Sequence, residues 1–273
     1  MKKSNSGKFA RSRLAVSLAV ALAMTLSSVQ GCHQSGATEA VKAAILPNAD
    51  KSYYYLQSQG LKAFRCTVQM NVKQSDGDQS KFAQLNKIQF SVVVDDQGSA
   101  KVTPFLASGR PIDHSLDETV SSGQQLVEAF FQMWDSLVFR GMFTGSDDEK
   151  KMTPWEQPDG FHYSGSFADG SREFVLTKDS LLTTMKMTSE GTTVVMQPKF
   201  TKTDGGLWLM TGIDTDKTVE AFPVNEEEKL SLQIQYQPLE GFQLPAKVEY
   251  QAALPTDVVT IDMNFTGYHL TKR

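Results

Sequence analysis

Few residues of this chain have the types and the spacing that catalysis requires. No pair of its histidines has the spacing of metal ligands, and the sequence contains neither HExxH nor CxxC. It also contains no GxSxG, no Walker-type phosphate loop and no GxGxxG. The sequence therefore predicts a protein that is not an enzyme, with no catalytic residues, no metal and no cofactor. The four histidines are His33, His114, His162 and His269.

Three further patterns have both a chemical and a structural interpretation. Asp113, His114 and Ser115 are the residue types of a hydrolase triad, but neighbours along one segment rarely converge. Ser115 stands three residues before Glu118, as in a helix capping box. The acidic run 226–228 is typical of a solvated turn rather than a cation site. Three tryptophans are expected in the core or at its rim rather than as a platform for sugars: Trp134, Trp155 and Trp208.

Cys32 is the residue to which the sequence assigns covalent chemistry. Residues 2–13 include five basic side chains and no acidic one, and residues 14–27 are apolar or small. The apolar run is too short to span about 30 Å of hydrocarbon, so it is typical of a secretory signal peptide. The segment ends in Val29-Gln30-Gly31-Cys32, which resembles the bacterial lipobox except at Gln30, where a small residue is usual.

The resemblance to a lipobox implies that residues 1–31 are a lipoprotein signal peptide, cleaved before Cys32. It also implies a diacylglycerol thioether on the Cys32 sulfur and an acylated new N-terminus. Two or three acyl chains hold a protein to a membrane far more firmly than one chain does. The expected location is the cell envelope, with a periplasmic body, and His33 in place of an aspartate favours the outer membrane where there are two. The alternative is an ordinary secretory signal with a chance cysteine.

Charge and cysteine count narrow the classes of partner. Removal of residues 1–31 leaves 22 basic and 31 acidic side chains, a net charge of −9. Anionic headgroups and phosphates repel such a chain, so the lipid must hold it to the membrane and nucleic acid is not an expected partner. Two cysteines cannot form a disulfide framework, and Cys66, on the apolar face of a predicted strand, is expected to be a core thiol.

The remainder of the chain is predicted to form one domain behind a tether. Residues 32–48 are rich in small side chains and are the expected tether, and a short helix is predicted over 49–58. From residue 64 onwards apolar and polar residues alternate in about eleven segments separated by turn signals. A loop containing Pro154 and Pro158 is expected between two of them. Because no linker interrupts these segments, residues 49–273 are predicted to be a single domain.

One long helix is predicted among the strands, over residues 116–140. Its apolar residues recur at spacings of three and four, and Gly141 suits its end. This face is more aromatic than docking on a sheet requires. Two roles are possible, a plug in the core or a lid over a cavity, and the aromatic face favours the lid. The face consists of Val120, Val127, Phe130, Phe131, Trp134, Leu137 and Val138.

Antiparallel strands with one apolar face must curl to bury it. Three arrangements do so: a closed and packed barrel, a sandwich, or an unclosed barrel with helices in its mouth. The third leaves an apolar cavity, and methionine suits a deformable site for flexible apolar ligands, although a plain core is also compatible with it. Five methionines fall on predicted inward positions: Met70, Met185, Met187, Met196 and Met263.

The order of elements resembles one known family. The short helix ends in "GLKAF", strand pairs and a capped helix follow, and a long run of strands closes with "GFQLPAKVEY" and "TDVVTIDMNFTGYHL". Over about residues 50–270 this is similar to the LolA/LolB-type family of lipoprotein carriers and receptors. The resemblance implies a mainly β fold with α: a curved antiparallel sheet of about 11 strands, forming an unclosed barrel with a helical lid. Freely diffusing carriers of the family lack a lipobox, so an anchored, receptor-like protein is expected.

This resemblance implies that the protein binds lipid or lipoprotein acyl chains in an apolar cavity. The alternative is a structural or protein-interaction lipoprotein of the envelope, with a filled core and a protein partner. On the first hypothesis the cavity is lined by Val68, Met70, Phe90, Val92, Phe130, Phe131, Trp134, Met185, Met187 and Met196.

Overall fold

The computed structural model describes residues 49–74, 83, 85–108, 112, 117–143, 152–168, 170–219, 226–254 and 257–273. The predictions for the signal peptide, Cys32, the tether 32–48 and the capping residue Ser115 lie outside the described residues. Within them, no helix is long and apolar enough to cross a bilayer.

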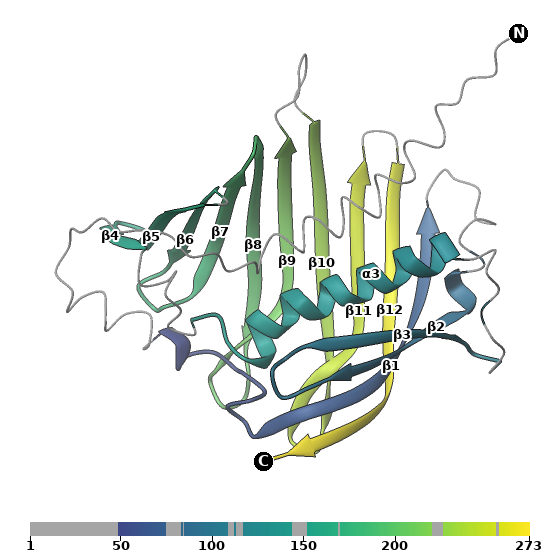
Figure 1. Ribbon diagram of the computed structural model, residues 1–273. Coiled ribbons are helices and arrows are strands. Elements are labelled where there is room, and N and C mark those ends of the chain that lie inside the picture. Colours follow the sequence, from purple (N-terminus) through teal and green to yellow (C-terminus); the bar gives the residue numbers. More distant parts are fainter. Residues whose placement is uncertain are drawn as a thin grey trace, which may run out of the picture.

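Twelve strands form one antiparallel sheet, in the order β3-β2-β1-β12-β11-β10-β9-β8-β7-β6-β5-β4 (Figure 1). Its two edges are β3 and β4, which do not pair within the described residues, so the sheet is not closed into a barrel. This confirms the predicted mainly β fold with an unclosed, curved sheet. The strands are β1 Leu61–Gln74, β2 Ile88–Val94, β3 Ala100–Leu106, β4 Thr153–Gln157, β5 Gly160–Phe167, β6 Gly170–Leu176, β7 Leu182–Ser189, β8 Thr192–Lys202, β9 Trp208–Val219, β10 Glu226–Leu239, β11 Phe242–Leu254 and β12 Asp257–Lys272.

The first and last strands of the sheet are neighbours. Leu61 of β1 lies opposite Lys272 of β12, and the pairing continues as far as Gln74 opposite Val259. All other neighbours in the sheet, from β1 to β3 and from β4 to β12, follow one another along the chain. The pairing of β1 with β12 therefore joins two meanders into one sheet.

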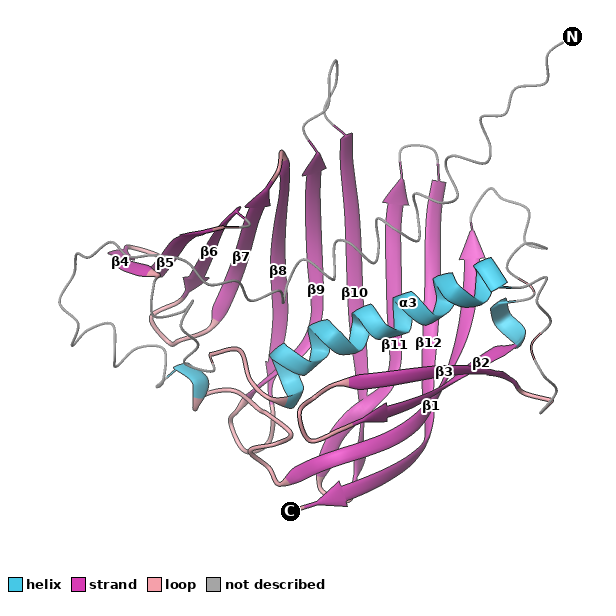
Figure 2. Cartoon of the chain, in the orientation of Figure 1, coloured by secondary structure: helices cyan, strands magenta, loops and turns pink. Residues whose placement is uncertain are grey.

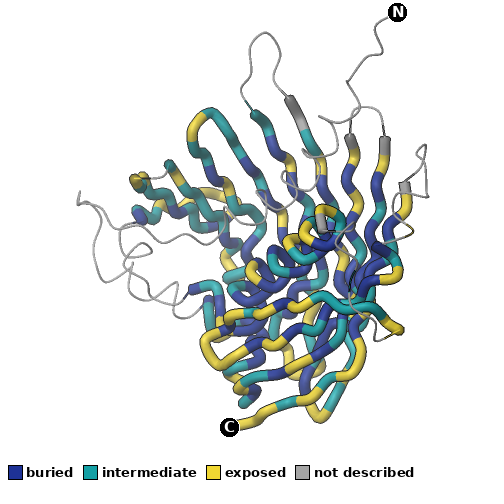
Figure 3. The backbone as a smooth tube through the Cα atoms, turned by 45° about the vertical axis from the view of Figure 1, so that its right-hand side comes forward, coloured by how far each residue is buried: buried dark blue, intermediate teal, exposed yellow. Residues whose placement is uncertain are grey.

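Alternation along each strand gives the sheet an inner face, which we define as the face that packs against helix α3 (Asp117–Trp134). Val68 of β1 lies between Phe90 of β2 and Phe265 of β12, and all three are buried. Polar residues occupy the alternate positions of β1, as a half-buried antiparallel strand requires. Figure 3 shows the buried segments gathered around the helix, with intermediate exposure along many of the other strands.

Helix α3 lies across the inner face, while β1–β3 curl around beneath it (Figure 2). A π-helical turn, η4 (Asp135–Phe139), extends α3, so the predicted helix over 116–140 is confirmed in type and nearly in length. Gly123 permits the close approach to β2, because a Cβ there would lie 2.8 Å from the Phe90 ring and 2.7 Å from Leu85. Leu85 belongs to the 3-10 helix η2 (Leu85–Lys87).

The structure corrects two predictions. Only residues 49 and 50 are helical in the segment predicted as a helix over 49–58; Tyr53 instead forms a bridge to Trp208, and a turn follows. The backbone hydrogen bonds Tyr54 N to Trp208 O and Trp208 N to Ser52 O hold the segment extended. The predicted loop with Pro154 contains strand β4, a short edge strand in which proline is tolerated because one side of the strand has no partner.

Candidate functional site

The ten residues predicted to line a cavity fall into two groups. Seven lie on α3 or on the strands beneath it and are at most 1% exposed, so that they form the packed contact between helix and sheet. Three methionines lie further along the sheet on β7 and β8, and one of them, Met185, is partly exposed. The seven are Val68, Met70, Phe90, Val92, Phe130, Phe131 and Trp134; the three are Met185, Met187 and Met196.

The first group is an aromatic core. The ring of Phe130 lies 5.5 Å from that of Phe265 on β12, and the ring of Phe64 on β1 lies 6.0 Å from that of Trp134. Trp134 Nε1 also donates to the Tyr236 hydroxyl on β10 at 3.4 Å. Edge-to-face and tilted rings at these separations are favourable, and together with the hydrogen bond they fix the helix against three strands, β1, β10 and β12.

A second apolar cluster lies toward the β4 end of the sheet. Tyr53 stands at its centre, with Phe143 and Phe200 edge-on at 6.4 Å and 5.2 Å between ring centroids. The Tyr53 hydroxyl donates to Ser180 O at 2.8 Å and accepts from Leu182 N at 2.6 Å, which ties the N-terminal segment to the turn before β7. The buried members of this cluster are Ala49, Tyr53, Tyr55, Phe143, Met152, Tyr163, Leu176 and Leu182.

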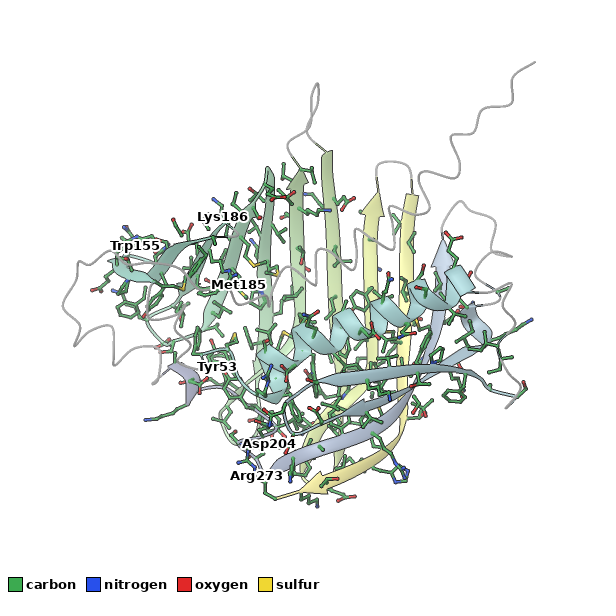
Figure 4. The ribbon with its side chains drawn as sticks, viewed as in Figure 1. Tyr53, Trp155, Met185, Lys186, Asp204 and Arg273 are labelled. Carbon is green, nitrogen blue, oxygen red and sulfur yellow. The ribbon has the colours of Figure 1, made fainter. Side chains whose placement is uncertain are left out.

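The two clusters meet along a boundary that we call the methionine seam: Met142, Met185 and Phe200, with the buried Met187 and Met196 beside them. The first three are only partly buried, and each packs against both clusters. Met185 lies directly opposite Met196 in the β7–β8 pair. Figure 4 shows Met185 on the face of β7 between Tyr53 and the far end of the strand. The seam therefore offers flexible, polarisable side chains that are not fully enclosed.

Two inward rows run across the sheet beside the seam. In the first, the successive opposite residues are Tyr163, Phe174, Met185, Met196 and Thr215, so the row is apolar apart from two hydroxyls. The second row is displaced by two residues along the strands and has charges at both of its ends. It consists of Arg172, Met187, Val194, Lys217 and Glu228.

One polar group of the first row has no partner in the part of the chain that the structure describes. The Tyr163 hydroxyl is buried and has no hydrogen-bond partner among the described residues, and burial raises its pKa to about 12. An unsatisfied buried hydroxyl costs free energy, so such a group requires an explanation such as a bound molecule. Sequence reasoning missed Tyr163 as a site residue, and only its place in the alternation of Phe161, Tyr163 and Phe167 could have indicated it.

Where the structure describes them, the ionisable residues considered for catalysis or metal binding have environments typical of a structural role. His162, on β5, lies 3.0 Å from Asp159 and 3.8 Å from Glu173, and its ring lies tilted against that of Trp155, with 5.3 Å between the centroids. Burial raises the pKa of the Cys66 thiol to about 12, which suits a core residue. Across the described part of the chain, no three His, Cys, Asp or Glu side chains gather to hold a metal. His114, Ser115 and Cys32 lie outside the described residues.

Comparison of the chain with protein-family models, with curated proteins and with solved structures gave no match. The resemblance to the LolA/LolB-type family therefore stays a prediction from the order of elements. The fold and the methionine seam are the findings on which a function must be argued.

Proposed function

We propose that the protein is a lipid-anchored envelope protein that binds acyl chains on the inner face of its sheet. The observation that carries this proposal is the methionine seam, where partly buried apolar side chains join two otherwise packed clusters. Methionine has three rotatable bonds and a polarisable sulfur, so a surface rich in methionine adapts to flexible chains. The lipobox-like segment ending at Cys32 supports attachment to a membrane, and a periplasmic body at the outer membrane remains our proposal.

The seam rather than the helix contact is the proposed position of the ligand. Trp134, Phe130 and Val68 have no exposed surface, so a chain bound among them would have to displace the helix. Met185 already has exposed surface and contacts both clusters. Each methylene buried there gains about 0.8 kcal/mol, so about eight methylenes gain roughly 6 kcal/mol before the costs of binding.

A structural or protein-interaction lipoprotein is the second candidate, and the packed aromatic core around α3 favours it. In that case the seven buried residues only stabilise the fold, and a protein of the envelope is the partner. The two functions differ in whether the isolated protein takes up lipid.

Native mass spectrometry distinguishes the two candidates. The mature chain carrying Cys32→Ser, purified from cells, is expected to retain bound lipid and to bind a fluorescent fatty-acid probe. A mass that corresponds to the bare polypeptide, together with no probe binding, would leave the structural function as the better explanation.

A further inference from the structure

The β9–β10 pair carries an ion pair on its inner face. Lys217 lies opposite Glu228, and its Nζ is 3.1 Å from Glu228 Oε2. The side chain of Lys217 is only 9% exposed, against 31% for Glu228. An ammonium has three N–H donors. Among the described residues Glu228 is the one hydrogen-bond partner of this ammonium, so it has the capacity to bind a further acceptor.

The same two strands carry a second ion pair that serves as a comparison. Lys229 and Asp216 lie opposite each other one residue further along, on the outer face, and are 70% and 58% exposed at a separation of 3.8 Å. A solvated pair of this kind is expected on the polar side of an antiparallel sheet. The inner pair has no such surroundings, because Val194 and Met187 continue its row.

Nearly buried ion pairs contribute little to stability, since desolvation offsets their attraction and apolar residues of similar size often replace them without loss. The fold alone therefore gives no reason for Lys217 on an inner face. The position of Lys217 relative to the methionine seam gives such a reason. Thr215 lies opposite Met196, and Lys217 lies about 7 Å beyond Thr215 along β9. Across the sheet, β9 is about 10 Å from β7, the strand that carries Met185.

We propose that Lys217 binds the anionic group, a carboxylate or a phosphate, of an amphiphile whose acyl chain lies on the methionine seam. This inference rests on the proposed function and adds the class of headgroup to it. The Lys217 ammonium keeps its bond to Glu228 and donates its other N–H groups to the ligand anion, as charge-assisted hydrogen bonds. The overall charge of −9 after cleavage would otherwise repel such a ligand.

The test compares three probes that share an oleoyl chain: oleate, oleoyl-lysophosphatidylglycerol and the uncharged monooleoylglycerol. Affinities are measured by displacement of a fluorescent fatty acid from the mature Cys32→Ser chain and from variants of it. Lys217→Met should weaken binding of an anionic probe about tenfold or more, without change for monooleoylglycerol. Lys229→Met, which removes the outer ammonium from the same strand pair, should leave all three affinities unchanged.

A second variant guards against misfolding, because Lys217→Met leaves the partly buried Glu228 without its partner. Lys217→Met/Glu228→Met removes both charges and should fold while losing the preference for anionic probes. A comparison of the affinities for oleate and for oleoyl-lysophosphatidylglycerol distinguishes a carboxylate site from a phosphate site. Equal weakening of all three probes, or no weakening, would overturn the assignment of Lys217 while acyl-chain binding stands. Failure of the Cys32→Ser chain to bind any probe would instead refute the proposed function.

Discussion

Trp134 Nε1 donates to the Tyr236 hydroxyl at 3.4 Å, and that hydroxyl donates in turn to Met210 O at 2.7 Å. The chain of bonds runs from α3 through β10 to β9 in the interior of the protein. Burial raises the pKa of Tyr236, so the hydroxyl stays protonated and able to donate. The helix is thus fixed to the sheet by a directional contact as well as by its aromatic face.

Replacement of Trp134 tests whether α3 is a core element. Its side chain is fully buried, so Trp134→Ala should lower the free energy of unfolding by about 3–5 kcal/mol. Trp134→Phe keeps most of the apolar volume and should cost less. Urea denaturation measures both. A loss of only about 1–2 kcal/mol for Trp134→Ala would indicate a loosely packed helix, as expected of a movable lid.

Two methionines of the inner face should behave differently. Met263 is fully buried in the aromatic core, so Met263→Ala should destabilise the fold by about 2–5 kcal/mol. Met185 is partly exposed at the seam, and Met185→Ala should cost less stability but weaken binding of a fluorescent fatty acid. Chemical denaturation and probe titration of the two variants provide the comparison. If probe binding weakened in both variants in proportion to their loss of stability, the seam would not be the binding site.

Glycine is required where β5 begins. Gly160 has φ of +149°, and a Cβ there would lie 2.0 Å from Leu176 O, a backbone atom that cannot move aside. Gly160→Ala should therefore be strongly destabilising in thermal denaturation. Gly206 is the matched control: its φ is +79° and a Cβ would meet nothing within 4 Å, so Gly206→Ala should cost about 1 kcal/mol.

One outer ion pair predicts a response to acid. The Lys199 ammonium, 2.7 Å from Asp214, holds the pKa of that carboxyl below its ordinary value of 3.8, with a further hydrogen bond from Ser231. The ionised carboxylate is thus favoured in the folded state, and its contribution to stability is complete above pH 3.8 and lost as the pH falls through the lowered pKa.

The measurement is denaturation of Asp214→Asn and of the unaltered protein at neutral pH and in acid. The unaltered protein should be slightly more stable at neutral pH, because the pair is exposed, and the difference should vanish in acid. Asp216→Asn, whose carboxyl lies 3.8 Å from Lys229, is the control on the same strand. A difference that grows in acid would contradict the argument.

The membrane anchor is tested at Cys32. Cys32→Ser removes the thiol that a lipid would modify, so the protein should move to the soluble fraction or keep its signal uncleaved. Cell fractionation and an immunoblot report both outcomes. A normally processed, membrane-bound Cys32→Ser protein would show that acylation of Cys32 is not what attaches the chain.

Period-two alternation predicted most of the sheet, because burial of one face dictates the pattern residue by residue. It failed at β4, where Pro154 interrupts the signal and only an edge position tolerates proline. It also failed at residues 49–58, where the bridge from Tyr53 to Trp208, more than a hundred residues away, overrides local helix signals. Non-local contacts of this kind have no signature in a single sequence.

The inward position of the three methionines on β7 and β8 was predicted correctly, since it follows from the same alternation. Their separation from the other seven residues could not be predicted, because it depends on where α3 lies across the sheet. Lys217 was missed although Ile213, Thr215 and Lys217 continue one face of β9. A charged residue at an inward position is the signal that could have identified it.

The register of β1 against β12 has a consequence for the way this chain is made. Leu61 pairs with Lys272, so the two meanders cannot join until β12 has been synthesised. Loops of that length close slowly, and the nascent chain stays incompletely folded meanwhile. Export machineries that thread polypeptides through a narrow pore require an unfolded substrate. On the proposal that residues 1–31 are an export signal, the late pairing of β1 with β12 leaves time for translocation.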